Sequence, residues 1–353
     1  MTVRLTARRV LRPDGSLLPG AVTIEGALIS AVEDLTPDEL EKAPDVTLAP
    51  GLIDMQVNGY ADMDVASSDA DTLLRLGDAL AARGTTSWCP TLTSRLLPAY
   101  DRWLDDHPKA APGEIGLHLE GPFISHAGAH RVETLRDPDL KWLDALPDRV
   151  RLMTLAPERN SGLAAIARLV AAHKVVALGH SDASYSEALA AAGAGATLVT
   201  HVFNAMAPLH HRDPGLAGAA LTDDRLIPAV IGDGVHVHPA ILGLVLTNGP
   251  AVLVSDSVAW ERPGLTVEGG AARMPGGGLA GSVVTLAEAV RVAVHTGNVP
   301  LGIALQAATS TPAAVLGELT RGRIAVGGRA DLVTLDTGLG LEAVWVGGER
   351  VRR

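Results

Sequence analysis

The stretch KVVALGHSDASYSEALAAAGAGATLVTH, residues 174–201, contains two short apolar runs separated by an alanine-rich segment. The runs KVVALGH and ATLVTH have the length and composition of buried β-strands, and SEALAAAG between them is typical of a helix. Each run ends in a histidine, His180 in the first and His201 in the second. The stretch therefore predicts a strand–helix–strand unit of a parallel sheet with an imidazole at the end of each strand.

Six further apolar runs continue this alternation along the chain, with helix-like segments such as DADTLLRLGDALAARG between most of them. Eight strands alternating with helices are typical of a TIM-like (β/α)8 barrel. A doubly wound open sheet would alternate in the same way, but no GxGxxG follows an early strand. Polar residues instead gather at strand ends, which favours the barrel. The six runs are 51–57, 85–92, 115–121, 150–156, 227–232 and 251–256.

Near both termini, short β-prone runs alternate with Gly, Pro and Asp turns, a pattern that indicates antiparallel hairpins. We therefore predict a small β-sandwich domain formed by both termini, residues 1–49 and 322–353. The catalytic (β/α)8 barrel would occupy residues 50–321. After its eighth strand we expect a Gly-rich hairpin over 261–282 and then a helix within 283–297.

The composition excludes several classes of partner. The 353 residues are 47% hydrophobic and carry a formal net charge of −11, which argues against a nucleic-acid groove or an anionic membrane surface. The single cysteine, Cys89, excludes an internal disulfide and a Cys-rich zinc site. No apolar run has the length of a membrane helix, and the start lacks the apolar core of a secretory signal. We expect a cytoplasmic enzyme with no nucleic-acid or membrane partner.

A carboxylate and two imidazoles at strand ends predict a metal site. Glu120 ends the run LHLE, as His180 and His201 end theirs. Each histidine alone is more often a core or loop residue, but neighbouring barrel strands lie only about 4.8 Å apart, so these side chains can share one ion. We predict one divalent transition metal per subunit. Zinc is the first choice for this ligand set, and Fe²⁺ and Mn²⁺ also fit it.

Two further polar residues are candidates for proton transfer and charge stabilisation. Asp256 ends the eighth apolar run, where it can accept a proton from an activated water, although an aspartate there can also be a turn or N-cap residue. His130, on the loop beyond Glu120, is placed to donate a hydrogen bond to an oxyanion. His118 points to the same face as Glu120 two residues later, so we expect it to support the site.

The segment HVFNAMAPLHHRDPGLAG, residues 201–218, is the predicted anion-binding region. Asn204 and Ala205 offer amide groups to a ligand, and the guanidinium of Arg212 suits a phosphate or carboxylate. A solvated arginine on a Pro/Gly loop is the alternative. His236, past the seventh strand, would assist Arg212.

The end of the first strand limits the number of metal ions. Many barrel hydrolases carry His-x-His there, whereas this chain has Gln56-Val57-Asn58. Amide side chains are poor ligands for a transition metal beside imidazoles. We therefore expect one ion and no second, deeper one.

A series of motifs resembles the N-acetylglucosamine-6-phosphate deacetylase family of the amidohydrolase superfamily over nearly the whole chain. The motifs occur in the same order as in that family, which makes the combination specific. They are PGLIDMQVNG, HLEGPF, GAH, GHSDA, THVFNAM, HHRDPGLAG, DGVHV, LAGS and GRIAVGGRADLV.

The resemblance implies a role for each matching position. Glu120, His180 and His201 would bind the metal. Asp256 would act as general base and then general acid, and His130 would polarise the acetyl carbonyl.

For the substrate, the resemblance implies that Asn204 and Ala205 contact the sugar phosphate from the same subunit. Arg212 and His236 would reach the phosphate bound by the neighbouring subunit, which implies a homodimer with shared sites. The Gln56-x-Asn58 pair matches members with one metal, and we count both amides as substrate-binding.

The expected activity is hydrolysis of N-acetylglucosamine 6-phosphate to glucosamine 6-phosphate and acetate. One alternative is an amidohydrolase acting on another N-acyl amino sugar or on a cyclic amide. Another is a non-catalytic barrel scaffold, although the three ligands and the aspartate are all present. Arg131, after the GAH histidine, and the Ser-Asp-Ser sequence around Asp256 depart from the family pattern and bear on substrate preference.

Overall fold

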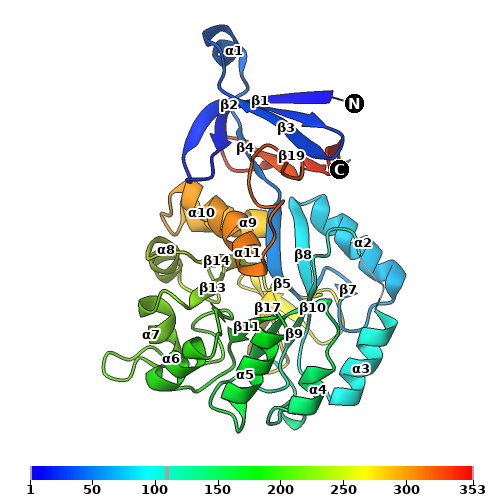
Figure 1. The fold of residues 1–353 in the computed structure, drawn as a ribbon, viewed down its shortest axis with the longest axis vertical. Coiled ribbons are helices and arrows are strands. Elements are labelled where there is room, and N and C mark those ends of the chain that lie inside the picture. Colours follow the sequence, from blue (N-terminus) through cyan, green and yellow to red (C-terminus); the bar gives the residue numbers. More distant parts are fainter. Residues whose placement is uncertain (1, 108–110, 352–353) are drawn as a thin grey trace.

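The computed structural model describes residues 2–107 and 111–351, which form two sheet-based domains (Figure 1). One is an eight-stranded parallel sheet surrounded by helices. The other is a seven-stranded sheet that draws strands from both ends of the chain. It lies over one end of the helix-covered sheet, so the opposite end is left open for the site described below.

The parallel sheet closes into a barrel. Its strands are neighbours in chain order, and the last meets the first where Asp256 N–H donates to the Gln56 carbonyl at 3.1 Å. Every strand lies within one of the eight predicted runs, which confirms the predicted (β/α)8 barrel. The strands are β5 (Leu52–Val57), β8 (Thr85–Leu92), β9 (Leu117–Glu120), β10 (Val150–Leu155), β11 (Val175–Leu178), β12 (Leu198–Val199), β13 (Ile227–Ile231) and β14 (Val252–Val254).

A helix follows each barrel strand and covers the outside of the sheet. In α2, Asp69 caps the first turn by accepting a hydrogen bond from Thr72 N–H, and Leu73, Leu76 and Leu80 form the buried face at helical spacing. The helices are α2 (Ala70–Ala81), α3 (Leu97–Asp106), α4 (Leu140–Asp144), α5 (Gly162–Ala171), α6 (Tyr185–Gly193), α7 (Gly215–Thr222), α8 (Pro239–Thr247) and α9 (Leu286–His295). A single 3₁₀ turn, η1 (Val132–Thr134), precedes α4 among the described residues.

The barrel interior is a packed apolar core. Side chains from seven of the strands, including Met55 and Cys89, form one buried cluster, which Leu316 joins from outside the barrel strands. Leu316 belongs to α11 (Ser310–Leu316), which follows α10 (Leu301–Ala307). Burial raises the pKa of the Cys89 thiol, so this residue is the small core side chain that its apolar strand predicts.

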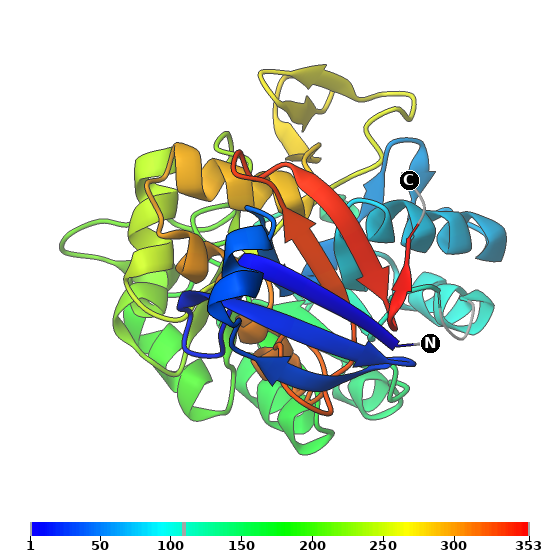
Figure 2. The same cartoon turned by 90° about the horizontal axis from the view of Figure 1, so that it is seen from above.

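The terminal sheet domain confirms the predicted pairing of the two chain ends. β1 pairs with β4 in parallel, β4 pairs antiparallel with β18, and Ala330 N–H donates to the Ala27 carbonyl, so the sheet curls over its own apolar core (Figure 2). Its order is β20-β19-β18-β4-β1-β2-β3. The elements are β1 (Thr2–Leu11), β2 (Leu17–Glu25), β3 (Leu28–Glu33), α1 (Pro37–Lys42), β4 (Thr47–Pro50), β18 (Leu332–Leu335), β19 (Leu341–Val346) and β20 (Glu349–Arg350).

Two small excursions lie beyond the carboxyl ends of barrel strands. A two-stranded ribbon, β6 (Gly59–Tyr60) and β7 (Met63–Asp64), follows β5. A three-stranded meander follows β14 within the predicted 261–282 segment. Its strands are β15 (Thr266–Glu268), β16 (Ala271–Arg273) and β17 (Leu279–Ser282). In the described part of the chain, no helix combines the length and the apolarity needed to cross a bilayer.

Candidate active site

The predicted ligand residues all lie at the carboxyl ends of barrel strands. Glu120 is the last residue of β9, and His180, His201 and Asp256 each lie two residues past β11, β12 and β14. Parallel strands end at the same rim of a barrel, so residues far apart in the sequence are brought to one place. All four line a single cavity.

The side chains of Glu120, His180 and His201 converge on one point. His201 Nε2 lies 3.0 Å from Glu120 Oε1 and 3.0 Å from His180 Nε2, and His180 Nε2 lies 3.5 Å from Glu120 Oε1. A tetrahedral zinc ion with bonds of about 2.0–2.1 Å spaces its ligand atoms by about 3.3 Å. One carboxylate and two imidazoles at these separations fit such an ion.

The hydrogen bond to the far nitrogen of His180 sets its tautomer. Its Nδ1 lies 2.8 Å from the carbonyl oxygen of His126, which can only accept. The proton of the neutral imidazole is therefore on Nδ1, and Nε2 presents a lone pair towards Glu120. His201 differs, because its buried Nδ1 has no hydrogen-bond partner among the described residues.

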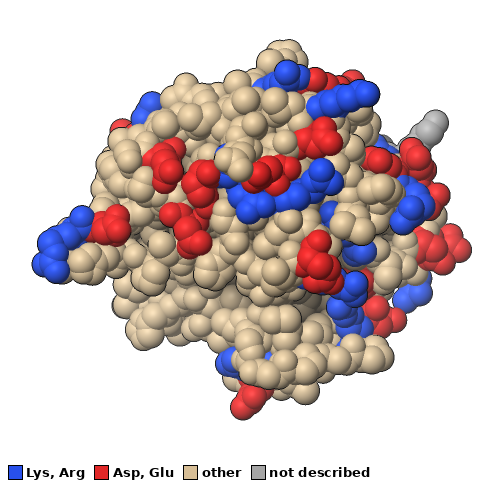
Figure 3. Space-filling model, turned by 90° about the horizontal axis from the view of Figure 1, so that it is seen from below, with Lys and Arg blue, Asp and Glu red and all other residues tan. Residues whose placement is uncertain are grey.

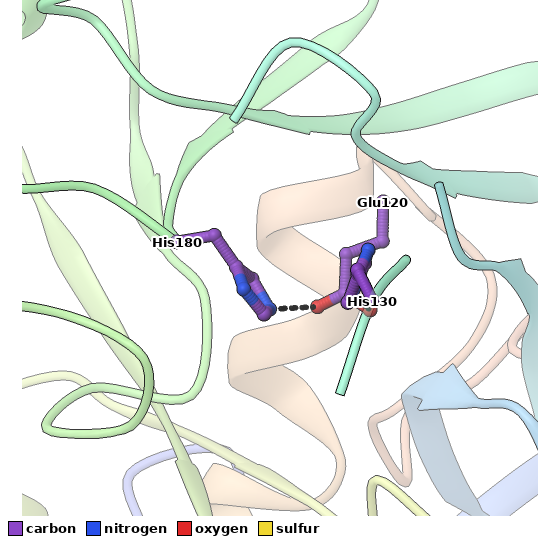
Figure 4. Close-up of side chains that lie close together, drawn as sticks. All are labelled: Glu120, His130 and His180. Carbon is purple, nitrogen blue, oxygen red and sulfur yellow. Dashed lines mark ion pairs between the residues drawn. The ribbon is translucent and has the colours of Figure 1, made fainter. Parts of the chain in front are cut away.

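His130 lies beside the same carboxylate but has the opposite tautomer. One of its ring nitrogens lies within 4.8 Å of the ligand atoms of Glu120 and His180. Figure 4 shows the three side chains close together. The backbone N–H of Ser94 donates to His130 Nδ1 at 3.1 Å, so Nδ1 must be unprotonated. The neutral ring then carries its proton on Nε2, 3.4 Å from Glu120 Oε2. This geometry makes His130 a hydrogen-bond donor rather than a metal ligand.

Glu120 is ionised despite its burial. Burial alone would raise its pKa, but the imidazoles of His130, His180 and His201 lower the pKa well below its usual value. The amide of Gln56 also donates to Glu120 Oε1 at 2.9 Å. Gln56, predicted to bind substrate, is thus in contact with the ligand carboxylate.

Asp256 faces the cavity from the seam between β14 and β5. Burial raises its pKa well above the usual value, although the nearby His201 lowers it in part, as does a hydrogen bond from Asn58. Asn58 Nδ2 donates to Asp256 Oδ1 at 2.8 Å. The second predicted substrate amide is therefore in contact with the proposed base, and it also lines the cavity.

The site residues His180, His201 and Asp256, each two positions past a barrel strand, have left-handed backbone conformations. The φ angles are +49° at His180, +28° at His201 and +49° at Asp256. For residues other than glycine such conformations cost about 1–3 kcal/mol each, and they are enriched at functional sites. Here they turn the chain sharply after the strand, so that each side chain points across the barrel mouth.

His118 lies below Glu120, as its position in the strand predicts. Its Nε2 lies 2.8 Å from Thr154 Oγ1 and its Nδ1 lies 3.3 Å from Thr91 Oγ1. Burial lowers the pKa of His118 to about 4, so the ring is neutral near pH 7. Through these two contacts His118 links β9 to the neighbouring strands β8 and β10 beneath Glu120.

The cavity has a volume of about 970 Å³ and opens at the barrel face shown in Figure 3, where acidic and basic side chains are interspersed. Asn204, Ala205 and His236 line it together with the metal-site residues. His236 Nδ1 lies 2.6 Å from Asp233 Oδ2, which orients the ring. His236 therefore faces the cavity of its own chain, and the contribution across an interface that the family resemblance implies stays a prediction.

Arg212 is the predicted residue that lies apart from the rest. It is exposed on the segment between β12 and α7, where its Nη1 lies 2.8 Å from His211 Nε2. It is not among the described residues that line the cavity of its own chain.

The sequence predictions missed several residues of the site. Ser94 fixes the His130 tautomer, and Asp233 orients His236 from three positions earlier. The Asp233–His236 pair could have been predicted, because the GDGVH motif places an acidic residue three positions before a histidine. The role of Ser94 could not have been predicted from its residue type, because it depends on a backbone N–H. Arg95 and Arg102, on the loop and helix after β8, also line the cavity.

Comparison with known proteins places this site in a family. The family model described as the amidohydrolase family matches residues 47–351. The chain therefore belongs to the amidohydrolase family.

Relatives within the family share a narrower description. The chain is 34% identical to the N-acetylgalactosamine-6-phosphate deacetylase of Escherichia coli O157:H7, over 99% of each chain. It is 36% identical to the human N-acetylglucosamine-6-phosphate deacetylase, over 99% of this chain and 95% of the relative. A mutant of the Mycobacterium smegmatis N-acetyl-D-glucosamine-6-phosphate deacetylase, solved with N-acetyl-D-glucosamine 6-phosphate, superimposes with a TM-score of 0.90, at 34% identity and 99% coverage of both chains. The Thermotoga maritima N-acetylglucosamine-6-phosphate deacetylase has a TM-score of 0.90, at 30% identity and 100% coverage of both.

Proposed function

We propose that this protein is a metal-dependent deacetylase that hydrolyses N-acetylglucosamine 6-phosphate to glucosamine 6-phosphate and acetate. The observation that carries the proposal is the convergence of Glu120, His180 and His201 beside Asp256 in one cavity. It occurs in a chain whose full-length relatives are named as deacetylases of amino-sugar phosphates.

Glu120, His180 and His201 would hold one divalent ion. Zinc suits a site of two imidazoles and one carboxylate, and Fe²⁺ or Mn²⁺ are the alternatives. Such an ion acts as a Lewis acid that polarises a carbonyl and lowers the pKa of water. The Gln56 amide holds the shared oxygen of Glu120 in place, and the His126 carbonyl holds His180.

The chain's own residues supply the proton transfers. Asp256 accepts a proton from the attacking water and passes it to the departing amine, because its carboxylate lines the same cavity as the three residues that would hold the ion. Asn58 holds one of its oxygens, which keeps the other available. The Nε2 proton of His130 would stabilise the negative charge that develops on the acetyl oxygen.

The phosphate would lie on the side of the cavity formed by Asn204, Ala205 and His236. Arg212 is exposed outside its own cavity, which supports a role at the cavity of a second copy of the chain. We therefore propose a homodimer in which Arg212 of each subunit contacts the phosphate held by the other. The proposed compartment is the cytoplasm, where the single free Cys89 would stay reduced.

The galactosamine epimer is the second candidate substrate, because the relative from Escherichia coli O157:H7 is named as a deacetylase of N-acetylgalactosamine 6-phosphate. An acetate-release assay on both 6-phosphates and on unphosphorylated N-acetylglucosamine, after reconstitution with Zn²⁺, Fe²⁺ or Mn²⁺, tests the proposal. We expect the highest kcat/KM on N-acetylglucosamine 6-phosphate. Activity on neither phosphate with any of the three ions would contradict the proposed function.

A further inference from the structure

Four arginine side chains line the same cavity, although the whole chain carries a net charge of −11. Arg95 lies in the loop after β8 and Arg102 on α3. Arg131 lies on the loop after β9, and Arg262 on the segment after β14. A local group of four cations in an acidic protein is where a negatively charged ligand would concentrate.

These arginines lie on the opposite wall from the proposed phosphate position. The strands β14, β5, β8 and β9 are consecutive around the closed barrel, and the segments that follow β8, β9 and β14 carry the four side chains. Asn204, Ala205 and His236 follow β12 and β13 instead. Glu120 and His180 line the same cavity. A ligand whose acetamide reaches these two residues can therefore extend towards both walls.

Few acidic side chains among the described residues neutralise the positive charges of these arginines. Arg262 pairs with Asp64 at 3.1 Å. The side chains of Arg95, Arg102 and Arg131 have no ion pair or hydrogen bond within residues 2–107 and 111–351. The other acidic side chain on this wall, Glu133, is exposed and equally unpaired in the described chain.

Arg95 shows the imbalance most clearly. Its Nε is buried and has no hydrogen-bond partner among the described residues. An unsatisfied buried donor on a charged group is unfavourable, because the group has lost its hydration without gaining a partner. Burial lowers the pKa of Arg95, and Tyr100 and Asp64 raise it in part. The positive charges of Arg131 and Arg262 lower this pKa further. An anion bound between these guanidinium groups would relieve both costs.

The size of the cavity points the same way. Its volume of about 970 Å³ is near the upper end of the range for small-molecule sites, roughly 300–1,000 Å³. A single hexosamine phosphate is a small ligand for such a space. The arginine wall therefore leaves room for a substituent on the sugar.

We propose that Arg95, Arg102 and Arg131 form a second anion subsite for a carboxylate or phosphate group that the acetamido sugar carries in addition to its 6-phosphate. The inference rests on the proposed deacetylase function and narrows its substrate class. Planar guanidinium groups bind both kinds of oxyanion through paired N–H donors. Arg131, which follows the GAH histidine where the family pattern differs, is then a residue that determines specificity.

Acetate release by the metal-loaded enzyme tests the subsite with matched pairs of substrates. One pair is N-acetylglucosamine 6-phosphate with a carboxymethyl group on O3, and the methyl ester of that carboxymethyl group. The other pair is N-acetylglucosamine 1,6-bisphosphate and the 1-O-methyl glycoside of N-acetylglucosamine 6-phosphate. We expect the wild-type enzyme to prefer the member with the second anionic group in at least one pair by tenfold or more in kcat/KM, and the preferred pair identifies that group as carboxylate or phosphate.

The variants Arg95→Gln and Arg131→Gln should each reduce that preference at least fivefold. Arg136→Gln is the matched control, because Arg136 is exposed on the same loop but does not line the cavity, and it should keep the wild-type preference. Arg131 is exposed, so its variant should fold even if the half-buried Arg95 position does not tolerate glutamine.

Turnover of N-acetylglucosamine 6-phosphate without a preference in either pair would overturn the second subsite alone. Equal losses on both members of a pair in the arginine variants would overturn it as well. Absence of acetate release from every substrate would overturn the proposed function, and the inference with it.

Discussion

The side-chain amide of Asn58 donates a hydrogen bond to Oδ1 of Asp256 at 2.8 Å, across the seam where the first and last barrel strands meet. The other carboxylate oxygen of Asp256 has no hydrogen bond in the described part of the protein. Asn58 thus orients the carboxylate and partly offsets the burial that raises its pKa. Gln56, two residues earlier, donates its side-chain amide to Glu120 in the same way, so the Gln-x-Asn pair orients two carboxylates of the site.

Replacing the proposed base should separate metal binding from turnover. In Asp256→Asn we expect kcat to fall by roughly 10²–10⁴-fold, the usual contribution of general acid–base catalysis. The bound metal, measured by elemental analysis, should remain at the wild-type level, because Glu120, His180 and His201 are intact. A near-normal kcat would remove Asp256 from the proposed role.

Removing the hydrogen bond to that base should shift the pH dependence. The Asn58 amide favours the charged carboxylate and so lowers the pKa of Asp256. In Asn58→Leu that pKa should rise, and a base with a higher pKa stays protonated to a higher pH. The acid limb of the kcat/KM profile should therefore move to higher pH. An unshifted limb with a reduced maximum would instead indicate that Asn58 contacts only the substrate.

The tautomers of the two imidazoles beside Glu120 predict different phenotypes. His180→Asn should lose most of the bound metal, because its Nε2 lone pair faces Glu120. His130→Asn should keep the metal yet lose roughly 10²–10³-fold in kcat, the usual effect of removing an oxyanion donor. Metal loss in His130→Asn comparable to that in His180→Asn would show that the ring ligates the ion.

The barrel and its principal site residues could be predicted from the sequence for a physical reason. Apolar runs that end in Glu120, His180, His201 and Asp256 fix both the strands and the rim at which their ends meet. The apolar runs locate the strands, and the parallel barrel brings the ends of those strands together, so the positions of these residues in the sequence determine their positions in the site.

Contacts between loops carried no comparable signal. The hydrogen bond from Ser94 to His130 links the loop after β8 to the loop after β9. Its donor is a backbone N–H, which every residue except proline has, so the residue type does not predict it. In the sequence Arg95 has no feature that distinguishes it from other polar loop residues, and only the closed barrel brings it into one cavity with Arg131 and Arg262. The position of Arg212 outside its own cavity depends on the path of one long connection. Such features need the folded chain.

A buried aspartate in the first strand should make stability depend on pH. Burial raises the pKa of Asp54 from 3.8 to about 6, although hydrogen bonds from Ser255 and Gln56 oppose the shift. The folded chain therefore binds this proton more tightly than the unfolded chain, and the aspartate increasingly destabilises the fold as pH rises from about 4 to about 6.

Asp54→Asn lacks this titration. Between pH 4 and pH 7 its free energy of unfolding should improve relative to wild type by about 2 kcal/mol, since one pKa unit corresponds to about 1.4 kcal/mol and the unfolded-state aspartate is already partly ionised at pH 4. Denaturant titrations at several pH values measure the difference, and Asp105→Asn, at an exposed position of α3, controls for the loss of a charge. A difference that does not vary with pH would contradict the assignment to Asp54.

The exposed Arg212 should act on the phosphate bound by a second subunit. Arg212→Ala should raise KM for N-acetylglucosamine 6-phosphate by roughly 10–100-fold, as expected for a charge-assisted hydrogen bond, and should affect the unphosphorylated sugar far less.

Mixing two impaired variants, assayed at substrate concentrations far below the wild-type KM where each alone has little activity, tests whether the contact crosses the interface. A dimer of one Asp256→Asn and one Arg212→Ala subunit contains one intact site, because the base and the arginine of that site come from different chains. Random pairing should restore about a quarter of the wild-type activity. Asp256→Asn mixed with His130→Asn should stay inactive, because both residues line the cavity of the same chain. Failure of the first mixture to recover any activity, with dimers formed, would place Arg212 outside a shared site.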